Sequence, residues 1–178
     1  MKKMDDLRQT VATCDRCGED YLGKSACGIG MERKHIVLMV GMNPWTENGA
    51  FKNGRGITKL LKYLNDWEFT DFFFDNIVKC EMPDKKPPKQ ANIVNCVGYL
   101  TEQIEMLSPC YTIVFGEVAA LSMGYPWKPW TEVVKNKVSV LPHFSSFLYS
   151  KNKKDLEEFY YKKLYKILFE APKQMSLF

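Results

Sequence analysis

Short, continuous apolar runs separated by helical patterns constrain the fold of this chain more than any other feature. The first run, residues 35–41, is rich in β-branched residues and stops at glycine, which is typical of a strand buried on both faces of a sheet. Similar runs occupy residues 72–78, 111–115 and 138–141, and helical patterns occupy residues 3–13, 57–64, 90–107, 118–123 and 156–169. Strands that alternate with helices imply right-handed crossovers and parallel pairing. We therefore expect a three-layer α/β/α sandwich with a mostly parallel, four-stranded central sheet.

Length and composition favour one globular domain inside the cell. The chain has 178 residues, of which 46% are hydrophobic, so we expect a single domain over residues 1–170 and a tail over residues 171–178. No apolar run reaches the roughly 18 residues that span a bilayer, and the charged N-terminus shows no secretory signal. We therefore expect a cytoplasmic protein, in which the six cysteines are metal ligands or reduced core residues rather than disulfides.

The chemically distinctive residues follow the ends of the predicted strands. Gly41 begins a turn after the first run, Asn76 lies at the end of the second, and Gly116 and His143 follow the other two. Ligands of open α/β sheets bind beyond the carboxyl ends of the strands. We therefore expect these residues to converge on one edge of the sheet and to form an active site there.

Two separated pairs of cysteines indicate a metal centre. Cys14 and Cys17 form a C-x-x-C pair near the N-terminus, and Cys80 and Cys96 follow much later. Four thiolates can hold a [4Fe–4S] cluster or a structural zinc ion, and the spacing does not separate these two cofactors. Four buried free cysteines are the alternative interpretation. The other two cysteines of the chain have no matching partner, so we do not expect them to be ligands.

Positive charge is clustered although the net charge is only +4. Lys85, Lys86 and Lys89 flank a proline-rich loop, and a second group of lysines follows His143. Such clusters can neutralise phosphates and favour a nucleic-acid partner. The alternative is a solvated surface that keeps the protein soluble.

Taken together, these segments resemble the uracil-DNA glycosylase superfamily, and most closely its iron–sulfur branch, often called family 4. The resemblance runs from Cys14 to about Tyr149 and rests on the C-x-x-C pair, the G-x-x-P turn, the Asn76-Ile-Val-Lys-Cys80 segment, the Ile113-Val-Phe-Gly-Glu-Val-Ala-Ala120 segment and the Leu141-Pro-His-Phe-Ser-Ser146 loop. Several positions differ from the pattern of that branch, and among them Asn43 and Trp45 resemble the turns of other branches of the superfamily. Met42 stands where the usual Gly-Glu-Ala-Pro-Gly motif has glutamate, and Phe144 stands where the loop has proline.

The resemblance implies a site that extrudes uracil from DNA and hydrolyses its N-glycosidic bond. Asn43 would orient the attacking water through its carbonyl oxygen, with Glu47 as an auxiliary base. Asn76 would offer a donor and an acceptor to O4 and N3–H of uracil. His143 would donate to O2 and stabilise the departing uracil anion. The fold, the iron–sulfur cluster and a DNA partner are implied in the same way.

Other residues of the implied site surround the base. Gly41 and Met42 belong to the first turn, Trp45 would exclude the thymine methyl group by its bulk, and Phe51 is the candidate for stacking on the base. Ser145 and Ser146 lie in the last loop, which would press into the minor groove of the DNA. Phe144 is a candidate apolar wedge there.

Two alternatives to an active glycosylase remain at this stage, and one segment suggests an additional partner. A catalytically weak or inactive glycosylase-fold protein would bind uracil or another deaminated base in DNA, an interpretation based on Met42. A zinc-binding structural module would explain the cysteines alone. The chain end, from Gln174 to Phe178, resembles the pentapeptide that docks on the replication sliding clamp, which suggests a second partner for what we expect to be a monomer.

Overall fold

The computed structural model describes residues 4–18, 21, 25–44, 46–47, 50–51, 54–83, 86–127, 134–135, 137–146 and 150–170. The helices are α1 (Met4–Ala12), α2 (Arg55–Asp66), α3 (Gln90–Leu107), α4 (Glu117–Ser122) and α5 (Lys153–Phe169). The strands are β1 (Ile29–Gly30), β2 (Val37–Gly41), β3 (Thr46–Glu47), β4 (Ala50–Phe51), β5 (Phe72–Asn76), β6 (Tyr111–Phe115), β7 (Val134–Lys135) and β8 (Val138–Leu141).

The main sheet has the order β1-β5-β2-β6-β8-β7. The four inner strands are the four that the apolar runs predicted, and they pair in parallel. This arrangement confirms the mostly parallel α/β sheet. The two edge strands were not predicted: β1 pairs with β5 and β7 pairs with β8, both antiparallel and each only two residues long. A separate hairpin joins β3 and β4.

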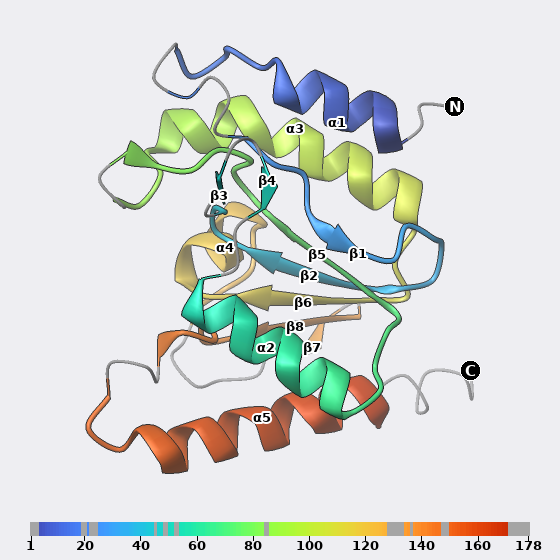
Figure 1. Cartoon of the computed structure of the whole chain (residues 1–178), viewed down its shortest axis with the longest axis vertical. Coiled ribbons are helices and arrows are strands. Elements are labelled where there is room, and N and C mark those ends of the chain that lie inside the picture. Colours follow the sequence, from blue (N-terminus) through green and yellow to red (C-terminus); the bar gives the residue numbers. More distant parts are fainter. Residues whose placement is uncertain are drawn as a thin grey trace.

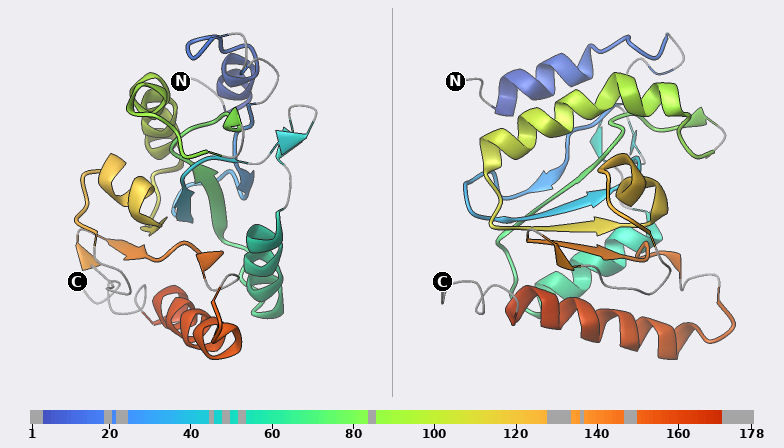
Figure 2. Two further views of the ribbon diagram at one scale, coloured as in Figure 1. Left: turned by 90° about the vertical axis from the view of Figure 1, so that its left-hand side faces the viewer. Right: turned by 180° about the vertical axis from the view of Figure 1, so that it is seen from behind.

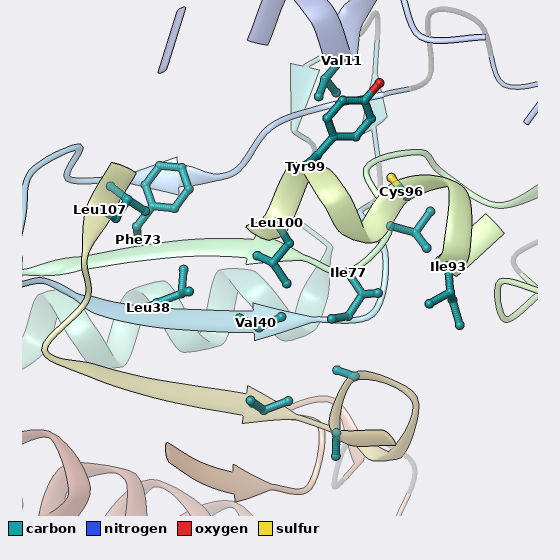
Figure 3. Packing of buried hydrophobic residues seen from close by; sticks show 14 of the residues in the cluster. Val11, Leu38, Val40, Phe73, Ile77, Ile93, Cys96, Tyr99, Leu100 and Leu107 are labelled. Carbon is teal, nitrogen blue, oxygen red and sulfur yellow. The ribbon is translucent and has the colours of Figure 1, made fainter. Parts of the chain in front are cut away.

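Helices cover both faces of the sheet, so the fold has the three expected layers (Figure 1). Helices α1 and α3 lie on one side and α2 and α5 on the other, and the turned views agree (Figure 2). Strand β2 shows why a continuous apolar run was needed. Leu38 and Val40 pack against the α1 and α3 side (Figure 3), whereas Val37 and Met39 pack against the α2 and α5 side.

The order of the parallel strands creates a crevice at one point of the sheet. From β2 the chain moves to β5 on one side, and then crosses through α3 to β6 on the other side of β2. The chain therefore leaves β2 through α2 on one face of the sheet and leaves β6 through α4 on the other face. In open α/β folds this switch point is where ligands bind.

No helix within the described residues is both long enough and apolar enough to cross a membrane. The C-terminal helix instead turns one apolar face to the sheet. Its buried residues are Tyr160, Tyr161, Leu164, Ile167 and Leu168.

Candidate active site

A cavity of about 670 Å³ opens at the carboxyl ends of the parallel strands. Met42, Asn43 and Pro44 line it from the turn after β2, and Asn76 lines it from the end of β5. Its wall is completed by residues after β6 and β8, namely Gly116, Glu117, Val118, His143, Phe144, Ser145 and Ser146. Three of the four strand-end residues that we expected to converge therefore line one cavity. Gly41 lies directly behind it, paired with Asn76 in the β2–β5 register.

The side chain of Asn76 is buried against the backbone of Gly41. Asn76 is 2% exposed, and its Nδ2 has no hydrogen-bond partner among the described residues. A Cβ atom at Gly41 would stand 2.6 Å from Asn76 Oδ1, so only glycine leaves room for the amide. Buried polar groups are normally hydrogen-bonded, and an unpaired one calls for an explanation such as a missing ligand.

His143 is held in one tautomer by Ser145. The backbone N–H of Ser145 can only donate, and it lies 3.3 Å from His143 Nδ1. Ser145 Oγ is 2.6 Å from the same nitrogen. Nδ1 is therefore the acceptor, and the proton of the neutral ring sits on Nε2, at the opposite side of the ring.

Burial keeps this imidazole neutral. It lowers the pKa of His143 from 6.5 to about 4, because a charged ring loses its hydration in the cavity wall. Phe144 contributes to this burial, with its ring centroid 4.2 Å from that of His143.

The prediction of Phe144 as a wedge into DNA is wrong. Its side chain is 4% exposed and packs in the core against Phe74 and Phe115, at centroid distances of 5.7 and 5.2 Å. The apolar ring is more stable there than in solvent. In the part of this loop that the structure describes, residues 142–146, Ser146 is exposed.

Asn43 lines the cavity and carries one unpaired oxygen. Its Nδ2 donates to the carbonyl of Pro44 at 3.2 Å, which orients the amide. Oδ1 is buried and has no hydrogen-bond partner among the described residues. This oxygen is therefore an unpaired hydrogen-bond acceptor in the wall of the cavity.

The N-terminal cysteine pair is fixed on α3, beside Cys96. Asn95 Nδ2 donates to the carbonyl of Arg16 at 2.9 Å and lies 3.9 Å from Cys17 Sγ. The guanidinium of Arg16 stacks over the ring of Tyr99 at 4.6 Å. Figure 3 shows Cys96 and Tyr99 on the same stretch of α3, with Val11 of α1 nearby. The C-x-x-C loop and α3 are therefore bound together.

All four predicted ligand cysteines share one environment. Burial and then the nearby thiols of Cys96, Cys17 and Cys14 raise the pKa of Cys80 to about 12. The backbone N–H of Lys79 donates to Cys96 Sγ at 3.1 Å. A soft thiol donor set of this kind suits an iron–sulfur cluster or zinc, and a bound cation would reverse the pKa shift. Within the described residues, no group of three or more His, Cys, Asp or Glu side chains already has the arrangement of a metal site.

Cys27 lies closer to this region than its isolated position suggested. Burial, followed by the charge of Asp75, raises the pKa of its thiol to about 11. Cys110 lies apart, with Sγ 3.5 Å from the carbonyl oxygen of Ile36.

Several predicted residues cannot be placed. Trp45, Lys85 and the chain end from Gln174 to Phe178 lie outside the described residues, as do the side chains of Glu47 and Phe51. Lys86 and Lys89 are exposed. Their loop begins at the cavity, which Glu81 and Met82 line.

The cavity also contains residues to which the sequence patterns assigned no role. Arg55 and Gly56 open α2 beside it, and a Cβ at Gly56 would stand 3.0 Å from Phe144 and Ser145. Glu81 and Glu117 add carboxylates to the wall. Glu117 follows β6 directly, within the segment that carries the family resemblance, but its position alone assigns it no role.

Comparison with known proteins gives consistent matches. The family model described as "Uracil DNA glycosylase superfamily" matches residues 29–166. The type-4 uracil-DNA glycosylase of Saccharolobus solfataricus is 30% identical over 122 residues, which cover 65% of this chain and 56% of the relative. That of Pyrobaculum aerophilum is 29% identical over 126 residues, or 67% and 64% of the two chains. The enzyme of the same name from Archaeoglobus fulgidus is 26% identical over 129 residues. The matched part thus spans between half and two thirds of these relatives.

Proposed function

Because the chain belongs to the uracil-DNA glycosylase superfamily, we propose that it removes uracil from DNA by hydrolysing the N-glycosidic bond of an extruded nucleotide. The observation that carries this proposal is the single cavity that Asn76 and His143 line together. One side chain is suited to recognise a pyrimidine and the other to stabilise it as it leaves. Extrusion is needed because neither group can reach a base inside the double helix.

Asn76 is the residue that recognises uracil. Its Nδ2, which lacks a partner among the described residues, donates to O4, and its Oδ1 accepts from N3–H. Cytosine presents the opposite pattern, an amino donor and an unprotonated N3. The fixed amide therefore leaves two mismatched contacts with cytosine, and buried mismatched polar groups give strong discrimination.

Gly41→Ala should impair this recognition without unfolding the protein. The new methyl group would stand 2.6 Å from Asn76 Oδ1 and 3.2 Å from Phe74 Cζ, so the amide must move. We expect a loss of roughly 10- to 100-fold in the single-turnover excision rate, as small displacements of positioned groups cause. Gly98→Ala is the matched control, since nothing lies within 4 Å of its Cβ position. An unchanged rate in Gly41→Ala would contradict the role of Asn76.

His143 acts on the leaving group. Its Nε2–H donates to O2 of uracil, where negative charge develops as the C1′–N1 bond breaks and the base takes the bonding electrons. The ring needs no proton transfer for this, because its low pKa keeps it neutral throughout. A neutral donor favours the uracil anion mainly in the transition state, which is what lowers the barrier.

Asn43 positions the water that completes the reaction. Oδ1 accepts a hydrogen bond from the water, whose oxygen bonds to C1′ of the cationic sugar and whose released proton balances the uracil anion. An amide cannot accept that proton at neutral pH, so we expect slower turnover than a carboxylate would give. Glu81 and Glu117, in the same wall, place negative charge near the cationic sugar.

The DNA-binding surface adjoins the cavity. Lys86 and Lys89 are exposed on the loop that begins at Glu81, and Ser146 is exposed on the loop after His143. Lysines beside the cavity neutralise phosphates on either side of the extruded nucleotide. Ser146 and the neighbouring Ser145 face the same DNA. The clamp-binding tail remains a proposal from the residues between Gln174 and Phe178.

Cys14, Cys17, Cys80 and Cys96 would hold a [4Fe–4S] cluster, with structural zinc as the alternative. The four thiols share one environment and are all soft donors, so this set of ligands fits either cofactor. The centre would supply a crosslink rather than a reaction step. It would tie the N-terminal loop to the segment after β5, and so support the strand end that carries Asn76.

Excision from labelled oligonucleotides tests the proposal. A uracil-containing strand should yield an abasic site, seen as alkali-sensitive cleavage, whereas matched thymine and cytosine strands should stay intact. The first turn has Met42 where the family motif has glutamate, and Asn43 carries an amide instead of a carboxylate. This difference favours a second candidate function: a weak or inactive relative that only binds uracil-containing DNA. If protein with an intact metal centre binds the uracil-containing strand but yields no abasic product, the result would support that candidate instead.

A further inference from the structure

A charged pair is fully buried behind the cavity. Lys79 is 1% exposed and Asp75 is 0% exposed, and Lys79 Nζ lies 2.9 Å from Asp75 Oδ2. The same ammonium group donates to Gln103 Oε1 at 2.6 Å and to the backbone carbonyl of Asn76 at 2.9 Å. The ammonium group therefore makes an ion pair with the Asp75 carboxylate and two hydrogen bonds, one to Gln103 and one to the Asn76 carbonyl.

Stability alone does not explain this pair. Taking two charges out of water costs about as much as their attraction returns, and apolar replacements of buried pairs are often neutral or stabilising. Apolar side chains surround this site, including Ile77 and Val78 in the same segment. An apolar residue would therefore pack well at position 79, and the ammonium group calls for a role beyond packing.

The pair holds the backbone of Asn76 on both sides. Asp75 Oδ1 accepts from the Asn76 N–H at 2.6 Å, and Lys79 Nζ donates to the Asn76 carbonyl at 2.9 Å. Because Asp75 and Lys79 are also bound to each other, the peptide groups flanking Asn76 are fixed as one unit. Gln103 anchors this unit to α3.

The same unit is covered from the N-terminal side. The backbone carbonyl of Lys79 accepts from the Ala26 N–H at 2.8 Å, and the backbone N–H of Lys79 donates to Cys96 Sγ. Gly28 packs so closely that a Cβ there would stand 2.8 Å from Asp75 Cβ and 2.0 Å from the Phe74 carbonyl oxygen. Water is thereby kept from the ion pair.

We propose that Lys79 is a positioning residue for the base-recognition step. With Asp75 and Gln103 it fixes the peptide groups of Asn76, so that the Asn76 amide meets the base in one orientation. This inference rests on the proposed function, because it assigns to Asn76 the recognition of uracil. Lys79 itself touches neither base nor sugar.

A double-mutant cycle tests whether Lys79 acts through Asn76. Single-turnover excision is measured for the wild type, Lys79→Met, Asn76→Ala and the combination of the two. Methionine fills similar space but cannot donate to the Asn76 carbonyl. Since Lys79→Met leaves Asp75 charged and unpaired, the cycle is repeated with Asp75→Asn/Lys79→Met, which removes both charges and protects folding. Thermal unfolding of every variant is recorded in parallel.

We expect Lys79→Met to lower the rate roughly 10- to 100-fold when Asn76 is present, and by less than about threefold in the Asn76→Ala background. Ser139→Ala is the matched control for a buried polar deletion. It removes the 2.8 Å hydrogen bond to the Tyr111 hydroxyl on strands away from Asn76, so it should lower the unfolding temperature without changing the excision rate.

The outcomes separate the two proposals. Equal losses in both backgrounds, or no loss in the wild-type background, would overturn the positioning role while leaving the proposed function intact. No excision by the wild-type protein would overturn the proposed function, and this inference with it.

Discussion

Replacing His143 with alanine should lower the single-turnover rate of uracil excision by roughly 10²- to 10³-fold. The neutral His143 ring lies in the cavity wall just after β8. Its Nε2 carries the proton because Ser145 occupies Nδ1. Charge develops on uracil only as the glycosidic bond breaks, so the loss should fall on the rate and leave DNA affinity unchanged. Electrophoretic mobility shift with uracil-containing DNA measures that affinity.

His35→Asn is the matched control for this variant. His35 is the other histidine of the chain and is exposed, and its φ of 63° is a conformation that asparagine tolerates. We expect wild-type excision from it. A His143→Ala variant that excises uracil normally would remove the leaving-group role, whatever the control does.

The pH dependence of the same proteins follows from the lowered pKa. The His143 ring stays neutral above its folded pKa of about 4, so its protonation should not reduce excision between pH 8 and pH 5. The free energy of unfolding should begin to fall at a higher pH than the excision rate does. Below an unfolded pKa of about 6.5 the unfolded chain binds a proton that the folded site refuses. The stability contribution of the neutral ring is therefore complete above pH 6.5 and decreases as the pH falls toward 4, by on the order of 3 kcal/mol. His143→Asn should lack this part of the decrease.

The strands that build the site were predictable because each is buried on both faces. A strand such as β6 (Tyr111–Phe115) must be apolar at every position, which separates it from the helical patterns around it. The edge strands could not be found in this way. Ile29 and Gly30 form β1 only because β5 offers them an edge to pair with, and two residues carry no periodicity.

The site was predictable in position but not in its internal contacts. The rule that ligands bind beyond parallel strand ends placed Asn76 and His143 together. It could not show that Ser145 sets the tautomer of His143, because Ser145 was assigned to DNA contacts from its place in the loop. Nor could it place Phe144, whose burial depends on the neighbouring rings of Phe74 and Phe115. The role of Lys79 became visible only when its two hydrogen bonds and its ion pair with Asp75 were located.

Cys80→Ser should remove the metal centre and with it the activity. Serine replaces a soft, buried thiolate by a poor ligand, so we expect the cluster absorbance, or the bound zinc, to be lost. Loss of a structural metal belongs to the changes that destabilise by more than about 4 kcal/mol, or about 8–16 °C in the unfolding temperature for a chain of this size. Visible absorbance, metal analysis and thermal unfolding measure these effects.

The physical reason for lost activity is the short path from Cys80 to the base. Lys79 directly precedes Cys80. The backbone N–H of Lys79 donates to Cys96 Sγ, and its ammonium group donates to the Asn76 carbonyl. Releasing the thiols therefore loosens the segment that carries Asn76. Cys110→Ser is the control: it changes a half-buried cysteine near the Ile36 carbonyl, which serine can also contact, so metal, stability and excision should all be kept. Full metal content and an unchanged unfolding temperature in Cys80→Ser would exclude this cysteine as a ligand.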